Sequence, residues 1–399
     1  MTEGTRFPPF SLTRVPKIAF GAGARSRLPA LAAEFGKRAL VVTGARSLRQ
    51  SSAWPEIEGG LRSAGFSWLD FVVSDEPSPL LVDGAVAAFR HERIAVVIGI
   101  GGGSVLDAAK AIAGLLRTGT PVSDHLEGVG PELPYRGPAV PFIAVPTTAG
   151  TGSEATRNAV LSVRGAGGYK KSFRDERLVA EWAVIDPDLL ATVPRALIAA
   201  DGMDALTQLL ESYVSTRANP ITDALALSGL DAVRRGLMTW HDGRDHGGSA
   251  RAAMAYAALL SGITLAQAGL GAVHGLASPL GAFFPAPHGA VCGTLLAATT
   301  RVNLAALRER DPDGTALRKY AAAGRVLTGT AADDTDALAG LLDLLETMTG
   351  RLELPRLSAY GVSPADVARI VEGSRGSSMK TNPVVLSDAE MAAILTARL

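Results

Sequence analysis

The strongest restriction on the fold comes from a glycine-rich turn between a buried strand and a helix. The apolar run IAVVI at residues 94–98 leads into glycines at positions 99, 101, 102 and 103, and a helical pattern runs from Ser104 to Leu116. Glycine lets the backbone turn sharply and approach a ligand closely. The free N–H groups and positive dipole at a helix N-terminus suit a phosphate.

We therefore predict phosphate binding at this turn, with Ser104 as the N-cap of the helix. The residues involved are Gly101, Gly102, Gly103 and Ser104. The alternative is a tight turn that binds nothing, but four glycines in five positions exceed what a turn needs. No Lys-Ser or Lys-Thr pair follows, which excludes a P-loop. Asp107 is a further candidate for cofactor binding, although an acid in the first helical turn can also simply complement the helix dipole.

The same alternation of strand and helix fills the first half of the chain. The predicted buried strands are Ala39–Val42, Trp68–Val73, Ile94–Ile98 and Phe142–Val145, and the predicted helices between them include Pro79–His91 and Ser104–Leu116. This order is typical of a parallel sheet with helices on both faces. After residue 187 almost only helical periodicity remains. We predict an α/β nucleotide-binding domain at residues 1–190 and an all-α domain at residues 191–399.

Charge and composition exclude several classes of partner. Lys and Arg together number 39, as do Asp and Glu, so no global field attracts nucleic acid or an anionic membrane. The single cysteine, Cys292, is consistent with a reducing compartment, and we expect a cytoplasmic protein. The uncharged stretch between Arg251 and Arg301 is broken by prolines and histidines, so we interpret it as buried core rather than as a membrane span.

A second polar loop follows the strand predicted at Phe142–Val145. In the sequence AVPTTAGTGSEAT, Thr147, Thr148 and Thr151 place hydroxyl groups at the carboxyl end of that strand, among glycines. Ligands of open α/β sheets bind at this edge. Two such loops in one sheet indicate a dinucleotide; the alternative is a loop that only caps the next element.

The second half carries a set of possible metal ligands. Asp204 and Gln208 lie four residues apart and share one face of a predicted helix, and His274 and His288 lie in the uncharged stretch. A buried imidazole needs a polar partner. A divalent metal, Zn²⁺ or Fe²⁺, is one such partner, and hydrogen bonding within the core is the other.

Taken together, the motifs resemble the iron-containing, or group III, alcohol dehydrogenases. The likeness extends over nearly the whole chain through GGGSVLDAAK, AVPTTAGTGSEAT, DGMDALTQLLESYVS and GAVHGLASPLGAFFPAPHG. It implies a dehydroquinate-synthase-like fold, with a Rossmann-like domain followed by a helical domain. It also implies that the glycine turn holds the pyrophosphate of a nicotinamide cofactor and that Thr147, Thr148 and Thr151 line the nicotinamide.

The resemblance further implies a metal bound by one Asp and three His, of which Asp204, His274 and His288 are present. Gln208 stands where the family usually has its first His, and Ser278 stands where it often has a proton-relaying His. The carboxamide of Gln208 is a weaker ligand than imidazole. The metal is therefore Fe²⁺ or Zn²⁺ bound with reduced affinity, or it is absent.

A third departure concerns the choice between NAD and NADP. Many family members carry an Asp after the strand that ends here in VVTG, and that acid repels a 2′-phosphate. Gly44 replaces it, and Arg46 and Ser47 follow. A guanidinium in place of a carboxylate admits the phosphate, so we expect NADP rather than NAD.

The predicted activity is that of an NAD(P)-dependent alcohol dehydrogenase or aldehyde reductase. It transfers hydride reversibly between a nicotinamide and a small alcohol or carbonyl compound, with Asp204, His274 and His288 acting through a metal. The alternatives are a metal-independent carbonyl or maleylacetate-type reductase, a sugar-phosphate-cyclase-like lyase and a non-catalytic sensor. The apolar residues Ala282–Phe284 are expected to line the substrate pocket. By the same resemblance we expect a homo-oligomer, a dimer.

Overall fold

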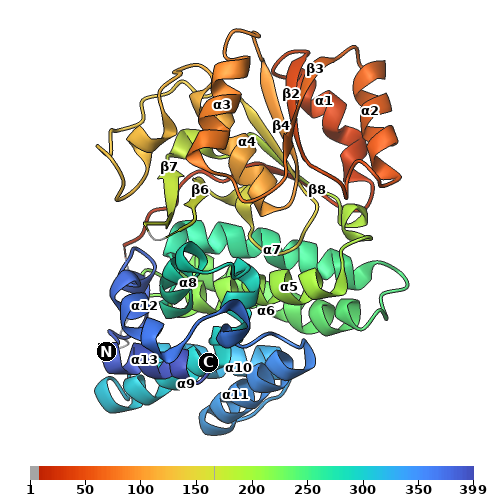
Figure 1. The fold of residues 1–399 in the computed structure, drawn as a ribbon. Helices are drawn as coiled ribbons and strands as arrows, with labels where there is room; N and C mark the ends of the chain where they lie inside the picture. Colours follow the sequence, from red (N-terminus) through yellow and green to blue (C-terminus); the bar gives the residue numbers. More distant parts are fainter. Residues whose placement is uncertain (1–8, 166) are drawn as a thin grey trace.

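The computed structural model describes residues 9–165 and 167–399. The chain forms an α/β half, drawn in red to yellow in Figure 1, and a helical half, drawn in green to blue. The first helix of the helical half, α5 (Arg195–Val214), follows the last strand of the α/β half, β8 (Trp182–Ile185), after one 3₁₀ turn at Pro187–Leu190. This order confirms the predicted fold class.

A parallel six-stranded sheet forms the centre of the α/β half. Its strands lie in the order β1-β8-β5-β4-β2-β3. Their bounds are β1 (Lys17–Phe20), β2 (Arg38–Gly44), β3 (Ser67–Val73), β4 (Val96–Gly101), β5 (Phe142–Pro146) and β8 (Trp182–Ile185). The inner strands are apolar at nearly every position, because both faces of the sheet are covered. The carboxyl ends of β4 and β5 lie side by side, with Gly101 opposite Pro146.

Helices cover the two faces of this sheet. On one face, α3 (Pro79–Phe89) and α4 (Gly103–Leu115) pack on Leu40, Val42 and Val97, and on the other, α1 (Leu28–Ala33) and α2 (Ala53–Ser63) pack on Val41 and Ile98. Neighbouring residues of one strand thus enter different cores. A separate antiparallel hairpin, β6 (Asn158–Val163) with β7 (Tyr169–Arg174), lies beside α4.

The helical half has one large core. Its helices are α5 (Arg195–Val214), α6 (Pro220–His241), α7 (Ser249–Ala268), α8 (Ala272–Phe283), α9 (His288–Arg310), α10 (Thr315–Thr328), α11 (Asp334–Arg351), α12 (Val367–Gly373) and α13 (Asp388–Thr396). Helix α5 is buried along most of its length and packs on α6, α7 and α9. Among the described helices, α7 and α9 are long and apolar enough to cross a membrane, but both lie mostly inside the protein, as core helices do.

Candidate active site

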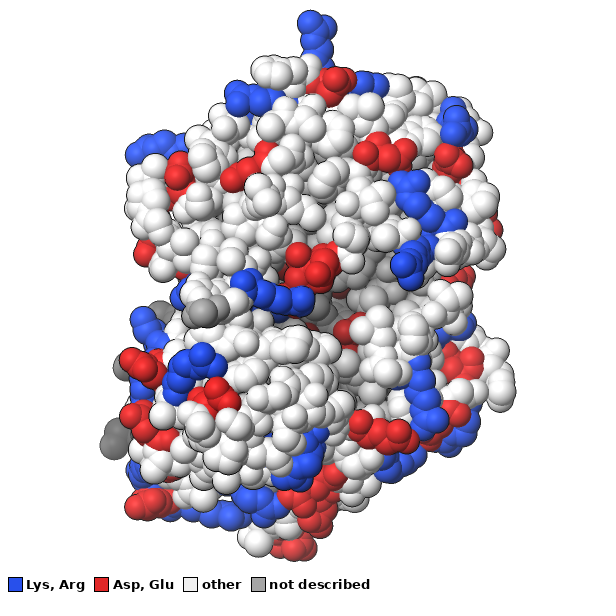
Figure 2. Space-filling model, in the orientation of Figure 1, with Lys and Arg blue, Asp and Glu red and all other residues white. Residues whose placement is uncertain are grey.

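The main cavity lies between the α/β half and the helical half. It has a volume of about 920 Å³, and Figure 2 shows a hollow between the two halves of the molecule, bordered by acidic and basic groups. Predicted residues from both halves meet in its lining: Gly102, Gly103, Ser104, Asp107, Thr148, Thr151, Asp204, Gln208, His274, Ser278 and His288. The two sets of motifs, far apart in the sequence, therefore share one cavity.

The glycine turn (residues 99–103) and the polar loop after β5, called here the threonine loop (residues 147–156), pack directly on each other. A Cβ atom at Gly102 would lie 3.2 Å from the side chain of Thr148, and one at Gly103 would lie 2.7 Å from the side chain of Thr151. The backbone N–H of Thr147 donates to the carbonyl oxygen of Gly101 over 3.0 Å. A larger residue at either glycine would therefore push the two loops apart.

Helix α4 begins one residue earlier than predicted. Gly102, not Ser104, is the N-cap, and no side chain caps the helix. Because glycine has no side chain to accept a hydrogen bond, the first N–H groups of α4 remain available to another acceptor. The prediction of Ser104 as the N-cap was therefore wrong, while the open helix N-terminus is the arrangement that suits a phosphate.

A buried lysine ties α4 to the threonine loop and to β6. The fully buried Nζ of Lys110 donates to the carbonyl oxygens of Ser153 and Asn158, each over 2.7 Å, and to the hydroxyl of Thr156 over 2.9 Å. Asp107 accepts from the hydroxyl of Ser153 over 2.5 Å and from the backbone of β6. Burial lowers the pKa of Lys110 to about 8, against the opposing charge of Asp107. These contacts attach the threonine loop to α4 and β6.

The threonine loop also rests on the helical half. Gly152 has φ = +62° and lies against Gly262 of α7, where a Cβ atom would be 2.1 Å from the carbonyl oxygen of Gly152. Only a residue without a side chain permits this approach. Lys110 on one side and Gly262 on the other therefore fix the position of Thr148 and Thr151 above the cavity.

Four possible metal ligands form a cluster, and three of them, Asp204, His274 and His288, line the floor of the cavity. Asp204 lies on α5, His274 on α8, and His288 with Cys292 on the first turns of α9, and their ligand atoms all lie within 4.8 Å of one another. The Nε2 atom of His274 lies 3.3 Å from Oδ1 of Asp204, and that of His288 lies 3.9 Å from it. The Sγ atom of Cys292 is 3.7 Å from the Nε2 atom of each histidine.

Glu211 orients His274 from the side away from the cluster. Seven residues after Asp204 on α5, the Oε2 atom of Glu211 lies 2.7 Å from Nδ1 of His274, and its Oε1 accepts the backbone N–H of Val273 over 2.7 Å. A proton on Nδ1 leaves Nε2 directed at Asp204 as the ligand atom. A carboxylate behind a histidine is the usual support of a metal-binding imidazole.

The two histidines of the cluster have opposite pKa shifts. Removal from water lowers the pKa of His288 to about 4, which the charge of Asp204 only partly opposes. Burial also acts to lower the pKa of His274, but Cys292, Asp204 and Glu211 around the ring raise it well above its ordinary value. Burial raises the pKa of the Cys292 thiol to about 12.

Buried polar atoms of the cluster lack hydrogen-bond partners among the described residues, as is expected of a site that binds a cation. Oδ1 of Asp204 and Nδ1 of His288 have no hydrogen-bond partner among the described residues, although Asp204 is only 1% exposed. A buried carboxylate oxygen without a donor is costly. A divalent cation among Asp204, His274 and His288 would satisfy it, so these residues fit the metal that the sequence predicts.

Gln208 and Ser278 lie at this site but make other contacts. The Oε1 atom of Gln208 lies 2.6 Å from the hydroxyl of Ser261 on α7. Ser278 lines the cavity, and its hydroxyl lies 3.5 Å from the carbonyl oxygen of Lys170. Both side chains thus line the cavity while being engaged by neighbouring elements.

The residues predicted to choose between NAD and NADP lie at the end of β2. Gly44 is the last residue of this strand, and Arg46 and Ser47 follow it with exposed side chains. They lie outside the lining of the main cavity. Arg49 is engaged instead: it donates to Thr43 over 3.0 Å and forms an ion pair with Asp70.

Sequence reasoning missed several residues of the site. Cys292 lies four residues after His288 on one helix face, and Glu211 lies seven residues after Asp204, so helical spacing was a usable signal for both. Asp201 lines the cavity one turn before Asp204. Ala282–Phe284 were predicted to line the pocket and do not. Its apolar lining includes instead Leu197, Ala200, Leu265, Ala266 and Leu270.

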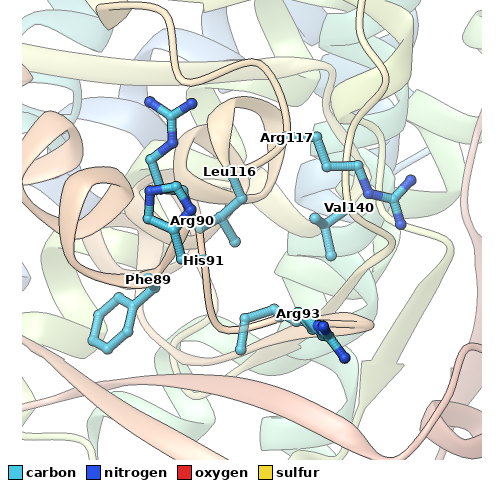
Figure 3. Close-up of a pocket in the computed structure, with 8 residues that line it drawn as sticks. Phe89, Arg90, His91, Arg93, Leu116, Arg117 and Val140 are labelled. Atoms are coloured by element: carbon cyan, nitrogen blue, oxygen red, sulfur yellow. The ribbon is translucent and has the colours of Figure 1, made fainter.

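A second, smaller cavity of about 310 Å³ lies at the opposite edge of the sheet. Its lining includes Phe89 at the end of α3, Arg90 and His91 after that helix, and Leu116 and Arg117 after α4. In Figure 3 the guanidinium groups of Arg90 and Arg117 point to opposite sides rather than toward a common point. It lacks the convergent polar groups of the main cavity.

Comparison with known proteins agrees with this arrangement. Residues 16–187 match the family described as iron-containing alcohol dehydrogenase, and residues 198–399 match the C-terminal part of the same family. Alcohol dehydrogenase 4 of Saccharomyces cerevisiae is 34% identical over 325 residues, 80% of each chain. The 1,3-propanediol dehydrogenase of Klebsiella pneumoniae is 33% identical over 370 residues, 90% of each chain.

The fold agrees equally well with solved structures. A crystal structure of a 1,3-propanediol oxidoreductase superposes with a TM-score of 0.87 at 31% identity, covering 98% of this chain and all of the other. The match extends over both halves and includes the elements that build the cavity. The chain therefore belongs to the iron-containing alcohol dehydrogenase family and is an oxidoreductase that acts on the CH–OH group of alcohols.

Proposed function

We propose that the enzyme transfers hydride reversibly between C4 of a nicotinamide dinucleotide and a small alcohol or aldehyde bound in the main cavity. The main support for this proposal is that two walls of different chemistry line the same cavity. One wall is the open N-terminus of α4 with the threonine loop, and the other is the cluster around Asp204. The first wall suits a dinucleotide and the second an alcohol oxygen.

The cofactor would lie along the carboxyl ends of β4 and β5. The pyrophosphate would bind at Gly101, Gly102, Gly103 and Ser104, where helix dipole and N–H groups are available. Thr147, Thr148 and Thr151 would place the nicotinamide against the helical half. Asp107 supports this site through Ser153, since its carboxylate already accepts that hydroxyl.

Asp204, His274 and His288 would hold the divalent metal, Fe²⁺ or Zn²⁺, with Gln208 beside them. When bound, the metal supplies Lewis-acid polarisation of the substrate oxygen. The chain's own part is to hold these ligands, to exclude water from the floor of the cavity, and to provide a hydroxyl at Ser278 for the proton. Water or the cofactor ribose can share that proton.

The main test is a panel of small alcohols and aldehydes with NAD(H) and NADP(H), in the presence of Fe²⁺, Zn²⁺ or a chelator. We expect reversible absorbance changes of the nicotinamide that need a metal. Full turnover by metal-free enzyme would instead favour a metal-independent carbonyl or maleylacetate-type reductase. Family membership argues against the lyase alternative.

We propose NADP as the preferred cofactor. Position 44, at the end of β2, is a glycine rather than an acid, and the exposed side chain of Arg46 follows it. Arg46→Asp should lower kcat/KM for NADP by roughly tenfold or more, since a charge-assisted contact is lost and a repulsive one gained. The activity with NAD should hold or rise. Equal losses with both cofactors would contradict this assignment of Arg46.

We propose further that the enzyme is a cytoplasmic homodimer. The support for the compartment is the single cysteine, with which the chain can form no internal disulfide. The support for the dimer is β1, an edge strand of the sheet that exposes Ile18 and Phe20, each at 41%. Edge strands with exposed apolar side chains are suited to pairing with another chain.

A further inference from the structure

Cys292 is the fourth member of the metal cluster, in a chain where Gln208 replaces the first His of the family motif. We propose that its thiolate, rather than the amide of Gln208, is the fourth protein ligand, and that the resulting Asp-His-His-Cys site selects zinc over iron. This inference rests on the proposed metal-assisted function and makes it more specific.

The distances among the four ligand atoms support this proposal. Zinc bond lengths of about 2.3 Å to sulfur and about 2.0 Å to nitrogen or oxygen place the donors of a tetrahedral site about 3.3–3.6 Å apart. The observed separations are 3.7 Å from Sγ of Cys292 to each Nε2 and 3.3 Å and 3.9 Å from Oδ1 of Asp204 to the two histidines. Four of the six separations among the ligand atoms are thus close to those of a tetrahedral zinc site, and the other two are at most 4.8 Å.

The partners of each group favour Cys292 over Gln208. Oδ1 of Asp204, nearly fully buried, has no hydrogen-bond partner among the described residues and faces the same space as Sγ. The Oε1 atom of Gln208, the only ligand atom that its amide offers, lies 2.6 Å from the hydroxyl of Ser261. The thiol of Cys292 is fully buried, and among the described residues its polar neighbours are the two histidines and Asp204, the other members of the cluster.

The position of Cys292 also leaves the site accessible. Asp204, His274 and His288 line the cavity, whereas Cys292 does not. Sulfur would therefore close the site from the protein interior and leave the cavity side uncovered for substrate. On binding, the cation takes the thiol sulfur as thiolate and the thiol proton passes to solvent, so no oxidant or reductant is involved.

The chemistry of the donors then determines the metal. A thiolate is a soft ligand, and together with two imidazoles and a carboxylate it matches zinc better than Fe²⁺. A site of three imidazoles and a carboxylate has no such preference for a softer ion. The replacement of one His by Gln208 and the presence of Cys292 therefore both favour zinc over Fe²⁺.

Cobalt substitution tests the sulfur ligand without reliance on activity. The chain has one cysteine, so a thiolate-to-cobalt charge-transfer band in the near ultraviolet can come only from Cys292. We expect this band in the full-length protein loaded with Co²⁺, its absence in Cys292→Ala and Cys292→Ser, and its retention in Gln208→Ala. Zinc affinity, measured by competition with a chelating dye, should fall at least roughly tenfold in Cys292→Ala.

A rescue variant distinguishes the loss of a metal ligand from the loss of folding. Gln208→His combined with Cys292→Ala replaces the thiolate by the family's usual imidazole. It should recover zinc affinity without the charge-transfer band and should bind iron better relative to zinc than the wild type does. Far-UV circular dichroism and cofactor binding report whether each variant is folded.

The outcomes separate this inference from the proposed function. Cobalt bound without the charge-transfer band, or unchanged in spectrum and affinity by Cys292→Ala, would overturn the role of Cys292 while metal-dependent alcohol oxidation could still stand. A Cys292-dependent band in a protein that turns over no alcohol or aldehyde would support the ligand and refute the activity. A wild-type protein that binds no divalent metal would refute both.

Discussion

At the scale of single residues, the cluster depends on groups that do not touch the substrate. Glu211 determines which nitrogen of His274 faces Asp204, because its carboxylate engages Nδ1 and the backbone N–H of Val273 together. A neutral amide at this position can accept only one of these hydrogen bonds and directs its own N–H groups at the other donor. The orientation of the ring is therefore sensitive to one charge.

Glu211→Gln should weaken zinc binding about 10–100-fold while the protein stays folded, as expected for a residue that supports a metal-binding histidine. Zinc affinity from competition with a chelating dye measures this. Glu346→Gln, an exposed change on α11, is the matched control. Unchanged affinity in Glu211→Gln would show that His274 is held without Glu211.

Asp201 gives a prediction about pH. Burial and the charge of Asp204 raise its pKa to about 8 from an ordinary value of 3.8, although Thr148 opposes the shift. Between these values the folded state binds more protons than the unfolded state, so the free energy of unfolding falls as pH rises, and the loss is complete above about pH 8. The side chain of Asp201→Asn is neutral at every pH, so this variant does not lose that part of the free energy of unfolding as pH rises.

Melting temperatures of metal-free protein between about pH 4 and pH 9 test this linkage. Asp201→Asn should melt several degrees above wild type at the alkaline end, and the difference should shrink toward the acidic end. A difference that does not change with pH would mean that the Asp201 carboxyl ionises normally in the folded protein.

The sequence predicted the residues of the site better than their roles. Asp204, His274 and His288 were identified, and the structure brings them together. Cys292 and Lys110 were not assigned a role, because a cysteine in an apolar helix and a lysine in an alanine-rich one have ordinary interpretations. Only their neighbours in space, two histidines in one case and the carbonyl oxygens of Ser153 and Asn158 in the other, reveal what they contact.

At the scale of elements, the threonine loop depends on the contact between Gly152 and Gly262. A methyl group at position 262 would overlap the carbonyl oxygen of Gly152 and force the loop away from α7. Thr148 and Thr151 would move with it. The loop contributes lining to the cavity, so this displacement should affect turnover more than stability.

Gly262→Ala should raise KM for the cofactor and lower kcat/KM roughly tenfold or more, with a loss of about 1–3 kcal/mol in stability from overpacking. Steady-state kinetics and chemical denaturation measure the two effects. Gly59→Ala is the control, because nothing lies within 4 Å of a Cβ there, and a helical Gly→Ala change should stabilise by about 0.5–1 kcal/mol. Wild-type kinetics in Gly262→Ala would contradict the role of this contact.

Elements with strong periodicity were predicted closely, and short ones were not. The strands β2, β3, β4 and β5 and the helices α3 and α4 lie within a few residues of their predicted bounds. The strands β1 and β8, of four residues each, and the hairpin β6–β7 were missed. Alternation in β7 is obscured by charged residues that face the cavity, and β1 carries apolar side chains on an edge, where no burial pattern marks the strand.

At the scale of the whole molecule, β1 is one of the two edge strands of the six-stranded sheet, and β3 is the other. Ile18→Lys on β1 places a charge where the proposed dimer buries an apolar side chain. It should shift the protein from dimer to monomer in sedimentation or light-scattering measurements. Leu80→Lys, on the 84% exposed position of α3, should leave the oligomeric state unchanged. A wild-type monomer, or an Ile18→Lys dimer, would contradict the assignment of this edge.

The pairing of β1 with β8 has a consequence for how the chain is made. Lys17 pairs with Trp182 and Phe20 with Ile185, so β1 has no partner until more than 160 further residues have been translated. Contacts so distant along the chain form slowly. The nascent protein must therefore carry an apolar, unpaired strand through the synthesis of its entire nucleotide-binding half, and this is the interval in which a chaperone or a second nascent chain would meet it.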